Sequence, residues 1–141
     1  MKKEQAIKTA ARWWRDKISK KVRHDNGDNS LTSMLAGAMA DSLAEDIPEE
    51  KLDKFEAALI QEIEEFTNRF GLHAHISLGC DYGPDYMLGQ AADKAEINDS
   101  CFPWKTCLLI YRNDEDKYQV RVSDGYGAPW VDLEPVKEET K

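Results

Sequence analysis

Two histidines at a two-residue spacing are the first residues in the chain that could bind a metal ion. His73 and His75 belong to a segment that alternates apolar and polar residues, so both lie on one face of an expected strand. Imidazole is a common metal ligand, but a site needs a third or fourth ligand close by. The sequence indicates no such ligand, and solvated imidazole on a polar strand face is the simpler interpretation. We therefore predict no metal and no cofactor.

A second polar group follows this strand. Asp81, Tyr82 and Asp85 lie where the strand ends and a helix begins, which is a common place for ligands in α/β units. Two carboxylates would repel a phosphate group, and a structural interpretation is available: Asp81 caps the helix and Asp85 complements its dipole. The carboxylates could also serve acid/base chemistry, but the sequence offers no nucleophile or pair of oxyanion donors, so it predicts no hydrolase.

Aromatic side chains provide two further candidates for binding. Tyr126 and Trp130 lie in the glycine- and proline-rich segment 124–130, whose composition is typical of recognition loops. These rings can equally fold back over an open face of the sheet. Trp13 is adjacent to the core residue Trp14 and projects about 100° further around the helix, either packing at the rim of the core or forming an exposed anchor.

The charge is unevenly distributed along the chain. The net charge is −8, but residues 1–24 hold nine Lys or Arg against two Asp or Glu, and the other 117 residues hold ten against 25. A basic helix with an aromatic plane can follow a phosphate backbone. However, a neighbouring acidic helix would neutralise that helix, and the overall charge opposes nonspecific nucleic-acid binding. We therefore predict intramolecular neutralisation, and direct nucleic-acid binding is not expected.

Acidic residues gather in the segments 45–65 and 113–116. If part of this charge stays unpaired after the basic helix has docked, it forms a surface suited to a basic protein partner. The acidic residues that we take as candidates for this surface are Glu49, Glu50, Asp53, Asp114, Glu115 and Asp116.

The elements that position these residues begin with helices. Apolar residues recur at three- and four-residue intervals over residues 3–22 and 48–70, and Ser30 can cap a helix over 31–45. Gly71 marks the end of the third helix. The first half of the sequence therefore predicts a unit of three helices.

Strands follow in the second half. We expect strands over 72–80, 104–112 and 117–123, the last two forming a hairpin, and a helix over 84–95. A parallel pairing of the first two strands would require a right-handed crossover. The sequence therefore predicts an α+β fold, in which a three-helix unit is followed by β-α-β-β with helices covering a three-stranded sheet.

Length and cysteine usage bound the class of protein. A chain of 141 residues suits one domain, which we place at residues 1–135 with a charged tail at 136–141. Cys80, Cys101 and Cys107 form no C-x-x-C pair and are expected to be small buried hydrophobes. With no signal peptide or membrane-spanning run, we expect a cytoplasmic protein.

Three segments resemble small proteins of bacterial prophages and other mobile elements, a group that includes anti-CRISPR inhibitors. They are Ala11-Arg12-Trp13-Trp14, Cys101-Phe102-Pro103-Trp104-Lys105 and Gly125-Tyr126-Gly127-Ala128-Pro129-Trp130. The resemblance implies that a small acidic binder of a nucleic-acid-handling partner is a class to consider. It assigns a role to no residue.

We expect a noncatalytic protein-binding module, in its specific form an acidic inhibitor of a nucleic-acid-handling host complex. The −15 balance outside residues 1–24 motivates this expectation. The alternative is a small-molecule binder or enzyme whose site combines the 81–85 loop with the loop of Tyr126 and Trp130, which requires the two loops to converge on one pocket.

Overall fold

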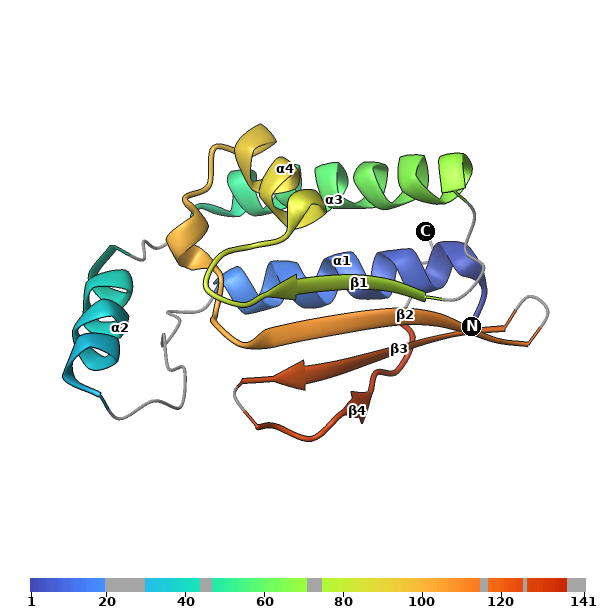
Figure 1. The fold of residues 1–141 in the computed structure, drawn as a ribbon. Coiled ribbons are helices and arrows are strands. Elements are labelled where there is room, and N and C mark those ends of the chain that lie inside the picture. Colours follow the sequence, from blue (N-terminus) through green and yellow to red (C-terminus); the bar gives the residue numbers. More distant parts are fainter. Residues whose placement is uncertain (20–29, 44–46, 71–74, 115–116, 126, 137–141) are drawn as a thin grey trace.

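The computed structural model describes residues 1–19, 30–43, 47–70, 75–114, 117–125 and 127–136. Helices and strands are mixed along the chain (Figure 1). The helices are α1 (Lys3–Ser19), α2 (Leu31–Leu43), α3 (Glu49–Phe70) and α4 (Tyr86–Lys94), with the 3-10 helix η1 (Asp99–Cys101). The strands are β1 (His75–Cys80), β2 (Thr106–Asp114), β3 (Lys117–Asp124) and β4 (Val131–Asp132).

The four strands form one antiparallel sheet in the order β1-β2-β3-β4. Alternation along the strands turns Ile76, Leu78, Leu108, Ile110, Val120 and Val122 toward the helices. The residues between them turn to the opposite face. The sheet thus has an apolar inner face and a more polar outer face.

Helices α1, α3 and α4 lie on the inner side of the sheet. α1 packs along β2 and β3, α4 lies against β1, and α3 packs on both helices (Figure 1). The apolar stripes expected from the sequence make these contacts, since Trp14 and Ile18 of α1 and Phe55 and Leu59 of α3 are buried. This arrangement confirms an α+β fold.

Phe102 joins the layers at the centre of the core. It is fully buried, and its ring centroid lies 5.8 Å from that of Trp14 and 5.9 Å from that of Phe55. Such ring pairs contribute beyond the area that they bury. The segment after α4 therefore connects α1 to α3 and closes the core.

The sheet differs from the expected one in three respects. It has four strands and not three, because Val131 and Asp132 pair with Val122 and Arg121 and form β4. β1 and β2 are antiparallel, so the condition for a right-handed parallel crossover is not met. β2 also begins at Thr106 and not at Trp104, because Lys105 has a φ of 57° and cannot continue a strand.

The segment after β4 is tied to the core. Leu133 donates its N–H to the carbonyl of Val120, and the N–H of Val136 bonds to Thr9 Oγ1 of α1 at 3.0 Å. The remaining residues of the expected tail, 137–141, lie outside the described residues, as do residues 20–22 and 72–74 of the expected first helix and first strand.

Candidate functional site

The expected acidic surface faces α1, which supplies cations to it. The guanidinium of Arg15 lies 2.5 Å from Glu49, 2.6 Å from Asp53 and 2.7 Å from Glu56. Arg12 pairs with Glu56 as well, at 2.6 Å. The intramolecular neutralisation predicted from the sequence is therefore confirmed for this part of α1 and α3.

The other acidic candidates are less engaged or lie outside the described part of the structure. Glu50 is largely exposed, and its nearest partner is Lys54 at 3.9 Å, one turn along α3. An exposed pair at this distance contributes little. Asp114 ends β2, with no side chain described, and Glu115 and Asp116 lie outside the described residues.

The loop after β1 uses its polar residues to hold its own conformation. Asp81 forms an ion pair with Lys105, whose ammonium also lies 4.4 Å from the ring centroid of Tyr82. Trp104 packs edge-on against Tyr82, with 5.2 Å between the centroids. Tyr82 is 56% exposed, so this cluster leaves one aromatic surface open to solvent.

Asp85, not Asp81, caps α4. Its carboxylate accepts hydrogen bonds from the N–H of Leu88 at 3.1 Å and of Gly79 at 2.7 Å, which fastens the helix to β1. Burial raises the pKa of Asp85, although these backbone hydrogen bonds act in the opposite direction. Both carboxylate oxygens already have backbone partners, so a structural role accounts for this residue.

The structure describes two of the three aromatic candidates, Trp130 and Trp13. Trp130 is 47% exposed just before β4, while Tyr126 lies outside the described residues. Trp13 packs edge-on against Trp14 at 5.1 Å and is partly buried on the core, with Lys17 5.5 Å above its ring. Trp13 is therefore placed at the rim of the core.

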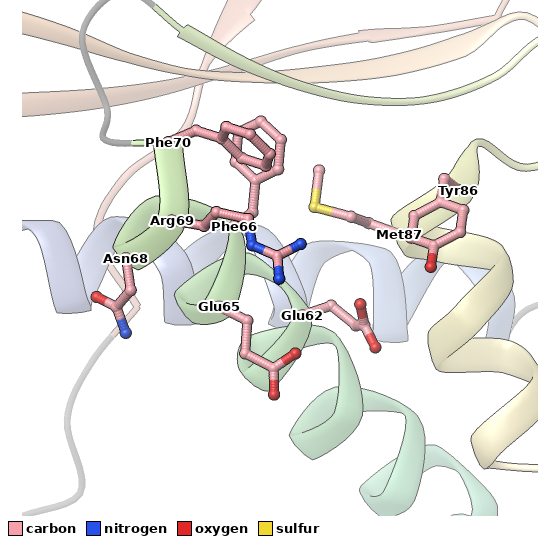
Figure 2. A pocket seen from close by; sticks show the side chains of 8 residues that line it. All are labelled: Glu62, Glu65, Phe66, Asn68, Arg69, Phe70, Tyr86 and Met87. Carbon is pink, nitrogen blue, oxygen red and sulfur yellow. The ribbon is translucent and has the colours of Figure 1, made fainter.

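A cavity of about 590 Å³ lies between the end of α3 and the start of α4 (Figure 2). Its lining combines aromatic, acidic and basic side chains: Glu62, Glu65, Phe66, Asn68, Arg69, Phe70, Tyr86 and Met87. Glu62 is paired with Lys94 at 2.8 Å, and Glu65 accepts a hydrogen bond from Gln61. No residue of this cavity was a candidate from the sequence, although the apolar stripe of α3 extends into it.

Helix α2 carries a second feature that the sequence did not single out. It lies at one end of the molecule beside η1, away from the sheet (Figure 1). Four of its large apolar side chains are more than half exposed: Leu31 (73%), Met34 (62%), Leu35 (56%) and Met39 (67%). At about 100° per residue they lie on one side of the helix. Their three- and four-residue spacing is visible in the sequence, but a helix packed on a core has the same spacing.

Within the described ranges, no group of three metal-ligating side chains comes together. His75 is exposed on β1, and His73 lies outside the described residues. None of the helices among the described residues is long and apolar enough to cross a lipid bilayer.

The comparisons with known proteins give no family for this chain. The sequence matches no protein-family model and no curated protein.

Proposed function

We propose that this protein is a noncatalytic protein-binding module and that α2 supplies its main contact. The exposed apolar side of α2 is the observation that carries this proposal. Soluble proteins rarely expose several large apolar side chains together unless the surface binds something. An amphipathic helix laid into an apolar groove is a recurrent mode of recognition, read through side chains spaced three and four residues apart.

The partner that fits α2 has an apolar groove bordered by Lys and Arg. Within α2 the only charged residue is Asp41, while the whole chain carries a net charge of −8. A strongly acidic protein associates fastest with a basic one and is repelled by its own copies. We therefore favour a basic, nucleic-acid-handling host protein as the partner and inhibition of that protein as the outcome, in the manner of an anti-CRISPR inhibitor.

The acidic part of the contact is proposed to be smaller than the sequence suggests. Arg12 and Arg15 already neutralise Glu49, Asp53 and Glu56, so these carboxylates contribute little attraction. Steering by net charge remains, and it acts on the rate of association more than on the final affinity.

The test compares two substitutions on α2. In Leu35→Glu the charge falls within the apolar side, and in the matched control Ala36→Glu it falls on an exposed position about 100° further around the helix, outside that side. Immobilised wild-type protein is used to capture host proteins, and the captured protein is then purified and titrated. We expect Leu35→Glu to weaken binding by about tenfold or more, because one buried Leu contributes about 1.5–3 kcal/mol. Ala36→Glu should bind like the wild type.

Three outcomes would contradict the proposal. Equal binding by both variants would exclude α2 as the contact. If the protein self-associates and Leu35→Glu abolishes this self-association, the partner of α2 would be a second copy of the chain. An affinity and association rate that do not change as added salt shortens the Debye length from about 10 to 3 Å would exclude a charge-selected partner.

A second candidate function is favoured by the cavity between α3 and α4. In place of the two loops expected from the sequence, this cavity would make the protein a small-molecule binder. Its aromatic rings and Glu65 favour an organic cation with an apolar body. Phenethylammonium should then bind, 2-phenylethanol should bind more weakly, and Glu65→Gln should remove the difference. Equal binding of the two compounds to the wild type would exclude this function.

A further inference from the structure

The outer face of the sheet bears a cationic cleft that the proposed contact through α2 does not use. His75 of β1 pairs with Tyr111 of β2, and Leu109 of β2 pairs with Arg121 of β3. The two cross-strand pairs are adjacent on the outer face, so together they span three strands. Together with Arg112 they line a cavity of about 280 Å³. Leu109 is the apolar member of this lining.

The charge of the cleft is opposite to that of the molecule. Among the described residues, its lining has two guanidinium groups and one imidazole and no carboxylate. Asp132 of β4 forms an ion pair with one of these groups, its Oδ1 lying 3.3 Å from Arg121 Nε. One carboxylate offsets one guanidinium, so Arg112 leaves the cleft positive in a chain whose net charge is −8.

Arg121 is held in place while part of its donor capacity stays unused. Its Nη2 donates to the Tyr111 hydroxyl at 2.9 Å, and its guanidinium lies 4.9 Å from the centroid of the same ring. Its Nε is buried and, among the described residues, has no hydrogen-bond partner, since the approach to Asp132 lacks hydrogen-bonding geometry. The Arg121 side chain as a whole is 39% exposed, so the part of the guanidinium that faces the cleft is what a ligand can reach.

We propose that this cleft binds the phosphate group of a small phosphate ester. Guanidinium groups match phosphate oxygens in geometry and charge. Two guanidinium groups and an imidazole are better suited to a dianionic ligand such as phosphate than to a ligand with a single carboxylate. The cleft is at the small end of ligand sites, which favours a compact ester. A polynucleotide also carries phosphate groups, but the negative net charge of the chain disfavours its binding.

The experiment follows the Nε–Hε resonance of Arg121 by NMR in the full chain during titrations at constant ionic strength. The probes are inorganic phosphate, glycerol 3-phosphate, adenosine monophosphate and a single-stranded DNA octamer, with chloride as the control anion. We expect saturable shifts of Arg121 with both esters and none with chloride. Arg121→Gln, followed through the backbone amides of β2, and Arg112→Gln should each weaken ester binding by about tenfold or more, as expected for a lost charge-assisted hydrogen bond.

Two control variants show whether the ester binds in this cleft and not elsewhere on the protein. Arg69→Gln removes a guanidinium from the cavity between α3 and α4 and should leave ester binding unchanged, as should Leu35→Glu, since the proposal does not depend on α2. If Arg121→Gln fails to fold, Tyr111→Phe tests the same site, because it removes the hydroxyl that orients Arg121 and should weaken binding.

The proposal is overturned by any of three results. The first is the absence of saturable binding by both esters. The second is ester binding that the Arg112 and Arg121 substitutions leave unchanged. The third is an affinity for the octamer far above that for the mononucleotide, because a cleft for one phosphate group gives no such gain and a nucleic-acid surface does.

Discussion

Arg15 of α1 and Glu56 of α3 form an ion pair of 2.7 Å in which each side chain is only 13% exposed. The two residues are 41 positions apart, and their contact fixes how the basic helix lies on the acidic one. Burial makes this pair more consequential than the exposed pairs around it, since removing one member deprives a partly buried charge of one of its partners.

Substitutions of this pair should measure that coupling. We expect Arg15→Ala to lower the free energy of unfolding by about 1–3 kcal/mol, because Glu56 loses a partner in a partly buried position. In a double-mutant cycle with Glu56→Gln, the double variant should lose at least about 0.5 kcal/mol less stability than the sum of the two single losses. Lys54→Ala, which removes only the exposed pair with Glu50, is the matched control and should change stability little. Additive losses in urea titrations would show that the pair is not coupled.

The same contact shows what charge counting can predict. Nine basic residues at the start of the chain and an acidic segment later predict that the two neutralise each other, and Arg12 and Arg15 do so. The count does not say which carboxylates are used. That choice depends on the rotation of α1 against α3, whose buried rings Trp14 and Phe55 both pack on Phe102.

Local sequence patterns predicted the helices and the hairpin. They did not predict the features that depend on which residues of separate strands pair with each other. β4 has two residues, too few for any period to be seen, and it exists because Arg121 and Val122 offer a free strand edge. The cleft on the outer face was missed for a similar reason. Alternation places Tyr111 and Arg121 on the outer face, but only the register of β2 with β3 brings them together.

The cap of α4 should be important for stability. Asp85→Ala removes acceptors from two N–H groups, those of Leu88 and Gly79, and should cost about 2 kcal/mol or more. Asp85→Asn should cost less, because its single amide oxygen can still cap the helix. Chemical denaturation near neutral pH compares the two variants. An equal loss in both would mean that the cap bond to Leu88, which the asparagine retains, contributes no stability.

The Asp85 carboxylate also makes a pH-dependent contribution. Because burial raises its pKa in the folded protein, the unfolded chain ionises first as the pH rises above about 4. The folded state then loses stability relative to the unfolded one until the pH passes the pKa of folded Asp85. The stability of the wild type minus that of Asp85→Asn should therefore fall as the pH rises through this window and level off above it. A difference that rises with pH would show that the backbone hydrogen bonds outweigh burial.

The three cysteines should differ in reactivity. Cys80 and Cys101 are buried, and burial raises the pKa of Cys80 to about 12, so almost none of it is thiolate at neutral pH. Cys107 is partly exposed on the outer face of the sheet. Under native conditions a maleimide should label Cys107 first and leave the other two unmodified until the protein unfolds. Rapid labelling of Cys80 in native protein, located by peptide mass spectrometry, would show that β1 opens readily.

Phe102 should be the most costly of these positions to truncate. Its ring is fully buried between Trp14 and Phe55, so Phe102→Ala leaves a cavity where α1, α3 and the segment before β2 meet. We expect a loss of about 3–5 kcal/mol in the free energy of unfolding. Phe70→Ala makes the same chemical change at a ring that is 59% exposed, and its loss should be much smaller. Urea unfolding of the two variants measures both losses. Similar losses would mean that the interior can collapse around the missing ring, and that Phe102 does not hold the two helices together.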